Sequence, residues 1–547
     1  MIKKRLTLLL AVMASIFGTA LGTCGDSCSC EYTSRSYLWV RPHFLSQSPE
    51  LISGFRDDRI RARESVFCSA FQAVAYGSKS RNWCSLARYF MPNCKRSLVA
   101  DSRICRDSSG MCNVGSDPIA PVAVDKDLLA EHFNIFYTKT DADYSDGAFS
   151  SRIWFEPEQT VVGAGIQLIG DIVSFCDSDR AIWGSISFPI EYVRNRMGLH
   201  EEILMTDGSV DKRGDEKVVA NMIEAFNQDE WEYGKICQGS MSRTGIADIE
   251  LKLGYRWLLR DPCYVSSYVG ILTPTGNKPT ARYLFEPVVG NGRRWGLMFG
   301  SYGGIRVIGS DDDRAFNCRL EFAGNSMYLL SQTYCRSLDL KCRPWSRYMA
   351  VYTSEEQADQ AAADLVAATT NEEERRAKNF AVSGINVFTV PVNVKGGFQS
   401  NATTSFVMTC ASFQAELGYN FFCRNAECVE LACPWKEGVA LKCSKITAGQ
   451  VNSVRDIRGR YETECNMYGC LCTDIPYSRA VISESDLNLN SAAAPLVFTQ
   501  TIFGAVGYRC DTCENPLFAN LGFSYEMSQS NAMLERWTIW GKVGVSF

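Results

Sequence analysis

Charged and amide side chains recur at alternate positions of three apolar segments, and these are the residues whose types and spacing could do chemistry. Those in residues 247–259 would share one face of a strand, because successive side chains of a strand point in opposite directions. Charges on one face need water or partners, and rings of charge set the ion selectivity of pores. Their mixed signs predict weak selectivity. The pore-lining candidates are Asp248, Glu250, Lys252, Arg256, Arg319, Glu321, Gln414 and Glu416.

Neither catalysis nor metal binding is indicated. General acid–base chemistry at neutral pH most often recruits histidine, and the chain has only 3, which are His43, His132 and His200. No nucleophile motif accompanies them, so we predict that the protein is not an enzyme and uses no cofactor. The cysteines within 470–472 and 510–513 have ligand-like spacing, but structural zinc usually needs four ligands in paired clusters. We therefore predict no metal site.

The elements that would position these residues are amphipathic strands, and the clearest ends the chain. Residues 535–547 alternate apolar and polar side chains, with Trp540 as the only misfit. The segment is slightly longer than the roughly 9–11 residues with which a barrel strand crosses a bilayer. Its apolar face carries Trp537, Ile539, Val543, Val545 and Phe547.

This last strand, with its C-terminal Phe547, resembles the closing strand of bacterial outer-membrane β-barrels. The resemblance implies that the five apolar residues are the assembly signal and that barrel-assembly machinery is a partner. At least five segments of about eleven residues alternate in this way; a soluble secreted β protein would alternate too. We predict an all-β fold, a transmembrane antiparallel up-and-down β-barrel of about 12–16 strands with helical and disulfide-rich loop insertions. The closing strand would pair with residues 65–77 or with a strand at His132.

The start of the chain indicates export. Residues 1–22 combine a basic beginning, an apolar stretch and a small-residue cleavage site, which is the pattern of a signal peptide. A lipoprotein acylated at Cys24 fits poorly, because Thr23 precedes the cysteine. After residue 22 no apolar run reaches the length of a membrane-spanning helix. We predict location in the bacterial outer membrane, with its lipid as a partner. The net charge of −5 gives no support to a nucleic-acid partner.

The remaining organisation follows from composition. We predict a Cys-rich N-terminal periplasmic extension over residues 23–63 and the barrel over 64–547. Within the barrel, 207–245 and 353–380 have helical character, and 423–480 form Cys-rich loops.

All 24 cysteines follow the signal peptide, which in an exported chain indicates disulfides. This load is unlike typical porins and resembles the cysteine-rich major outer-membrane proteins of chlamydia-type bacteria, in which disulfides crosslink porin-like barrels. The resemblance implies disulfide-linked envelope proteins or further copies of the chain as partners. The close pairs that we take as disulfide candidates are Cys28, Cys30, Cys423, Cys428, Cys470, Cys472, Cys510 and Cys513.

Two functions remain open. The first is a porin-like channel that passes small solutes by diffusion and is stabilised by disulfides. The second is a structural or surface-exposed envelope protein, crosslinked by disulfides and without an open pore, in which the inward charges only solvate a filled barrel. The helical insertions could fold into the lumen or lie on the rim.

Overall fold

A computed structural model gives the fold of the chain. It describes residues 34–43, 48–54, 69–102, 127–139, 147–175, 180–211, 217–260, 262–309, 316–341, 343–354, 356–357, 360, 381–441, 446–447, 450–451, 481–510, 515–528 and 530–547. The predicted signal peptide lies outside the described residues.

Twelve antiparallel strands form a closed barrel, which confirms the predicted fold class. Neighbours in the barrel follow the order of the chain, and pairing of β1 with both β6 and β29 closes it. Its strands are β1 (Ser69–Ser80), β6 (Glu158–Ser174), β7 (Ala181–Arg196), β11 (Glu250–Arg260), β12 (Cys263–Leu272), β13 (Gly296–Ile308), β14 (Asn317–Leu329), β20 (Gly397–Cys410), β21 (Phe413–Arg424), β27 (Val497–Cys510), β28 (Leu517–Ser528) and β29 (Arg536–Ser546).

The closing strand finds the first of its two predicted partners. β29 pairs with β1 from Ala70 opposite Ser546 to Ser80 opposite Arg536. Beyond the strand, the Ser69 and Phe547 main chains hydrogen-bond to each other in both directions at 2.9 Å. The alternative at His132 is wrong, because that residue lies in a 3₁₀ turn.

The outer surface of the barrel is apolar. Leu253, Val269 and Leu521 are 52%, 62% and 66% exposed, while the residues that alternate with them are mostly buried. Of the predicted assembly signal, Ile539, Val543 and Phe547 are exposed and Trp537 and Val545 are half-buried. An outward apolar band with a polar interior is the arrangement of an outer-membrane barrel, and this surface agrees with the predicted outer-membrane location. No helix in the described part of the chain is long and apolar enough to cross a membrane.

Large inward aromatic side chains lie directly opposite glycines of the neighbouring strand. Trp540, the one misfit of the last strand, points inward against Gly522, where a Cβ atom would come within 2.1 Å of the indole ring. Only glycine allows this close approach. The pairs are Tyr76–Gly163, Trp183–Gly254, Tyr268–Gly300, Tyr264–Gly304, Phe503–Gly418, Trp540–Gly522 and Phe518–Gly544.

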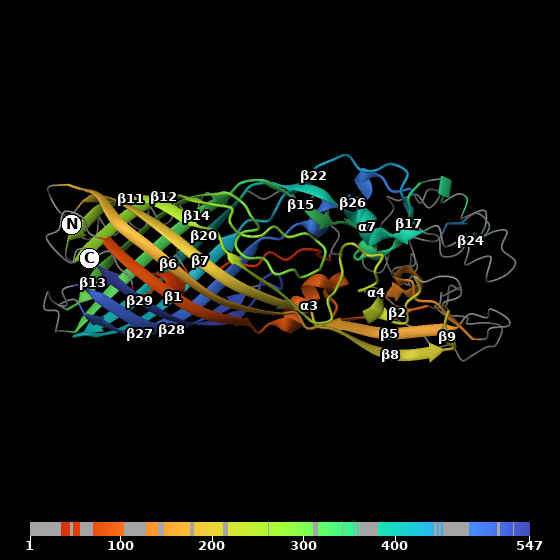
Figure 1. Cartoon of the computed structure of the whole chain (residues 1–547), viewed down its shortest axis with the longest axis horizontal. Helices are drawn as coiled ribbons and strands as arrows, with labels where there is room; N and C mark the ends of the chain where they lie inside the picture. The colour runs from red at the N-terminus through yellow and green to blue at the C-terminus, as the bar shows by residue number, and fades with distance from the viewer. Residues whose placement is uncertain are drawn as a thin grey trace.

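The two ends of the barrel differ, as Figure 1 shows. The chain ends at the left, where the connections between strands are short; at the right the long connections fold into a second body, here called the cap. The cap contains β2 (Ser97–Asp101), β3 (Leu128–Leu129), β4 (Tyr137–Thr138), β5 (Ala148–Phe155), β8 (Leu199–Asp207), β9 (Ser209–Val210), β15 (Gln332–Ser337), β16 (Asp339–Leu340), β17 (Ala350–Tyr352), β18 (Val382–Ser383), β19 (Thr389–Val394), β22 (Val429–Leu431), β23 (Ala440–Leu441), β24 (Ile446–Thr447), β25 (Gln450–Val451) and β26 (Leu487–Asn488).

The helices of the cap are short, and a buried aromatic cluster holds them together. Phe90, Phe133, Phe226, Trp345 and Tyr348 are each no more than 2% exposed. The helical elements around this core are α3 (Trp83–Phe90), η2 (Pro92–Cys94), η3 (Ala130–Phe133), α4 (Met222–Ala225), η4 (Ser346–Tyr348), α7 (Gly384–Phe388), η6 (Glu484–Asp486) and η7 (Leu489–Ala492).

The predicted insertions are only partly described. In 207–245 the helix is a single turn, α4, capped by Asn221, and it is followed by β10 (Ser240–Ile246). β10 pairs with residues 190–196 of β7 and so extends the wall, while α4 packs in the buried core of the cap. Most of 353–380 and of the Cys-rich region 423–480 lies outside the described residues.

The cysteines give a mixed result. Cys423 is a free thiol, so it does not pair with Cys428 as its spacing suggested. Disulfides at Cys428 and Cys510 stay a prediction. The other five candidates, Cys28, Cys30, Cys470, Cys472 and Cys513, lie outside the described residues. Crosslinking between chains therefore stays a prediction.

Candidate functional site in the barrel lumen

The predicted pore-lining residues face the inside of the barrel, but they are not open to water. Arg319 shares the inward face of β14 and is half-buried. The other seven are at most 9% exposed: Asp248, Glu250, Lys252, Arg256, Glu321, Gln414 and Glu416.

On one side of the lumen the charges pair within the wall. The Arg256 guanidinium donates two hydrogen bonds to Asp171 of β6, at 3.0 and 2.9 Å. The Lys252 Nζ atom lies 2.8 Å from the Glu250 carboxylate. Arg256 and Lys252 therefore have partners without any ligand or open water path.

The other side of the lumen binds the chain's own N-terminal part. Residues 34–43 and 48–54, here called the luminal segment, run from the cap along the inner faces of β1, β21, β28 and β29. We predicted residues 23–63 as a periplasmic extension; their described part runs from the cap into the barrel. Alternation marks strands, and it gives no signal for an irregular segment enclosed by them.

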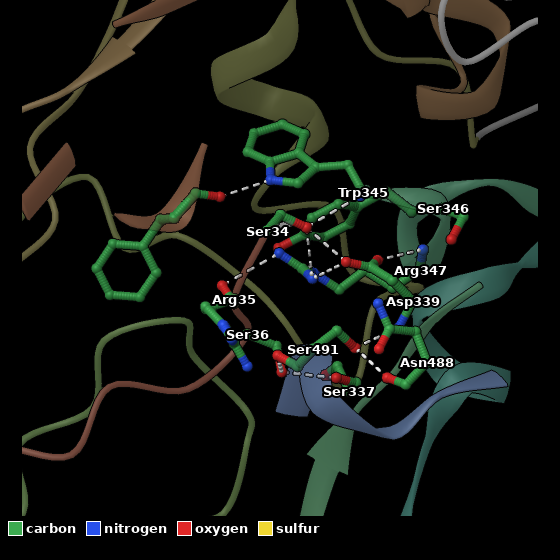
Figure 2. A network of polar contacts seen from close by, with 12 residues as sticks. Ser34, Arg35, Ser36, Ser337, Asp339, Trp345, Ser346, Arg347, Asn488 and Ser491 are labelled. Carbon is green, nitrogen blue, oxygen red and sulfur yellow. Dashed lines mark hydrogen bonds and ion pairs between the residues drawn. The ribbon is translucent and has the colours of Figure 1, made fainter. Parts of the chain in front are cut away.

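Figure 2 shows the cap end of the luminal segment. Asp339 and Arg347 form a buried ion pair at 2.7 Å, and Ser34 donates to the same carboxylate at 2.5 Å. The Ser36 hydroxyl donates to the Ser337 carbonyl at 2.6 Å. These contacts fix the segment where it leaves the cap.

At the mouth of the barrel two aromatic residues of the segment contact arginines. The Arg336 guanidinium lies 3.1 Å from the Tyr37 ring centre, and that of Arg424 lies 4.3 Å from the Trp39 ring. Cation–π contacts of this kind strengthen when they are shielded from water. Glu427 lies between these arginines, and its carboxylate is 2.6 Å from the Arg424 guanidinium.

Deeper in the lumen, Arg41 is the main charged contact of the segment. Its guanidinium donates to Glu526 at 3.0 Å and to Asn420 at 3.2 Å. Glu526 also accepts from Arg536 of β29 at 2.7 Å and from Thr499 of β27 at 2.7 Å. The carboxylate therefore joins the segment to three strands of the wall.

Lower down, the wall binds the main chain of the segment around α2 (Pro49–Ile52). Lys542 and Gln72 both donate to the Leu51 carbonyl, at 2.9 and 3.3 Å. The Gly54 N–H donates to Glu416 at 3.0 Å. The Leu51 side chain joins a buried apolar cluster with inward residues that include Trp540. The lumen is filled at this level.

Sequence reasoning found the polar wall and missed what occupies it. Arg536 and Lys542 stand on the polar face of the last strand, so their alternation could have added them to the candidates. Arg41 and Trp39 carry no such signal, because neither lies in an alternating segment. Only their contacts identify them.

Comparisons with known proteins show likeness in fold alone. No family model and no curated protein matches the chain. Among solved structures, an outer membrane channel from Pseudomonas putida F1 is 7% identical, with TM-score 0.32, and the alignment covers 89% of this chain and 97% of that one. The transport unit of the autotransporter AIDA-I from Escherichia coli is 8% identical, with TM-score 0.30 and coverages of 88% and 90%. A FadL homologue from Pseudomonas aeruginosa is 7% identical, with TM-score 0.26 and coverages of 93% and 99%. The fold assignment rests on the strand pairing of this chain.

Proposed function

We propose that the protein is an outer-membrane channel for small solutes, which the luminal segment closes. The observation that supports this most is the kind of contact between wall and segment. Lys542, Gln72 and Glu416 bind its main chain by hydrogen bonds. Such groups are satisfied equally by water, because folding exchanges one hydrogen bond for another at small net gain. A wall of this kind is stable both when it binds a peptide and when it faces the water of an open pore.

The closed form explains why the inward charges are buried. With the segment in place, an open porin lumen is absent from the described part of the barrel, so diffusion requires the segment to move. Short periplasmic turns and long extracellular loops are usual in these barrels, which would place the cap outside the cell. Outer-membrane lipid and barrel-assembly machinery are the partners that this role needs.

Conductance of the intact protein tests the proposal. We expect rare, brief openings from wild-type protein refolded into planar bilayers, and frequent openings after deletion of residues 34–54. Heat-dependent gel mobility of unboiled samples would verify that the deletion variant is a folded barrel. The Arg152→Gln variant is the matched control, since this residue forms an exposed pair with Glu202 in the cap. Silence from both wild type and a correctly folded deletion variant would exclude the channel.

The filled lumen also supports the second candidate, a crosslinked envelope protein without a pore. Free thiols are exposed at Cys94 and Cys433 in the cap and at Cys410 at the opposite end. Thiols in those positions are accessible for bonds to other envelope proteins or to further copies of this chain. Large multimers that collapse on reduction would support this role; an identical monomer band with and without reductant would contradict it.

A further inference from the structure

Three arginines surround a single carboxylate at the mouth of the barrel. Arg294 lies just before β13, Arg336 lies in β15, and Arg424 is the last residue of β21. Their guanidinium groups lie 3.7, 3.6 and 2.6 Å from Glu427, and all four side chains are at most 4% exposed. We call this group the mouth cluster.

The mouth cluster holds more positive than negative charge. Burial alone would raise the pKa of Glu427, but Arg424, Arg336 and Arg294 together lower it to about 2, so the carboxylate is ionised. Among the described residues, Glu427 is the only carboxylate within ion-pair distance of these guanidinium groups. Two of the three positive charges have no counter-charge there, and buried charges without a partner are strongly destabilising.

The hydrogen bonds of the cluster show the same deficit. Arg424 Nη1, Arg294 Nε and Arg336 Nε are buried and have no acceptor. Native proteins rarely leave such donors unpaired unless an ion or water meets them. The cluster therefore offers several donors to a negatively charged acceptor.

A cavity lies at this position. The space, counted out into the open solvent, measures about 250 Å³, and its enclosed part has room for about one water-sized atom. Arg294 and Arg424 both line it. Lys395 and Asn425 stand in the same lining. The Lys395 side chain is 53% exposed at the edge, and its ammonium group lies 2.5 Å from the exposed Glu430 carboxylate. The lining thus combines buried guanidinium groups with a further ammonium group beside the solvent.

We propose that this cavity binds a small anion, of the size of chloride or of a single carboxylate group. The guanidinium groups of Arg294 and Arg424 supply charge-assisted donors, and Lys395 attracts the anion from outside. The bound anion offsets the positive excess of the mouth cluster. It stabilises the place where Arg424 contacts Trp39 of the luminal segment.

Anion-dependent thermal stability of the full-length, refolded protein tests this site. Loss of the fast-migrating folded band with temperature is measured at constant ionic strength, while a bulky sulfonate buffer anion is replaced stepwise by chloride or by acetate. We expect a saturable rise in the transition temperature with either anion. No saturation with either anion would overturn the proposal.

Two substitutions in the cluster give opposite results. Arg294→Gln removes one positive charge and should weaken chloride binding on the order of tenfold. Glu427→Gln adds one net positive charge and should tighten it by a similar factor, although the variant itself is less stable. Equal affinity in both variants would overturn the site.

Exposed residues complete the test if the buried variants do not fold. Lys395→Gln should weaken chloride binding several-fold, because it removes a nearby positive charge whose attraction for the anion is only partly screened by salt. Arg152→Gln, in an exposed pair far along the chain, should leave it unchanged. Unchanged binding in Lys395→Gln would count against the site. The measurement uses the closed barrel, so silence of both wild type and the folded deletion variant would refute the channel and leave the anion site standing.

Discussion

Substitution of Arg41 by methionine tests whether the luminal segment controls opening. Arg41 is 3% exposed and makes two hydrogen bonds to the wall, one of them to the ionised carboxylate of Glu526. Methionine has a similar length and keeps contact with the Phe422 ring, over which the guanidinium lies at 4.5 Å. Glu526 retains its bond from Arg536, so the wall is not left with an isolated charge.

The size of the effect follows from these contacts. Hydrogen bonds to charged groups contribute about 1.5–3 kcal/mol, and the lost packing is small. We take about 2 kcal/mol as the free energy by which the substitution destabilises the closed state relative to the open state. In the open state the Arg41 contacts are already broken. Since about 1.4 kcal/mol is a factor of ten, the ratio of open to closed time should rise roughly 30-fold.

Single-channel recording at fixed voltage measures that ratio directly. The Arg152→Met variant is the control, because it removes an arginine whose pair with Glu202 is exposed. An exposed pair is worth little, so the control should behave as wild type. If the Arg41→Met protein folds and opens no more often than the control, the segment does not close the barrel.

Three further predictions concern assembly and pH. Gly522→Ala should cost about 1–3 kcal/mol of stability by overpacking against Trp540, measured by heat-dependent gel mobility, whereas Gly77→Ala should be tolerated because no atom lies near the added Cβ. Deletion of Phe547 should lower the amount of inserted protein in membrane fractions; wild-type amounts would contradict the assembly signal. The folded pKa of Glu427 is about 2, below its ordinary value of 4.5, so its stabilisation is complete above about pH 4.5 and is lost as the pH falls toward 2. The stability gap between wild type and Glu427→Gln should therefore close over that range, and a constant gap would show that Glu427 is not ionised.

The barrel could be predicted from the sequence because one face of each strand meets lipid. A period of two is enough to identify such strands, and it placed seven of the eight pore-lining candidates at buried inward positions. The same rule marked Trp540 as an irregularity. Its inward position depends on Gly522 of the neighbouring strand, and which strands pair cannot be read from one segment.

The contents of the lumen could not be predicted for a different reason. Residues 34–43 form no regular element, and many of their contacts are with groups several hundred positions away, such as Arg41 with Glu526. Local pattern carries no information about such contacts. The core of the cap was missed for the same reason. Phe133 and Trp345 join one buried cluster only after the long connections between strands have folded together.

The contacts of the lumen divide into two sets, and this division bears on opening. Arg256 with Asp171 and Lys252 with Glu250 pair within the wall, so they persist whether or not the luminal segment is present. Arg41 contacts the opposite wall, where Glu526 has Arg536 as a second partner. Removal of the segment would therefore leave Asp171, Glu250 and Glu526 each with a cation of the wall. In a barrel that is only structural, Glu526 would not need a second cation beside Arg41. In a wall that faces the peptide in the closed state and water in the open state, Arg536 keeps the carboxylate paired in both.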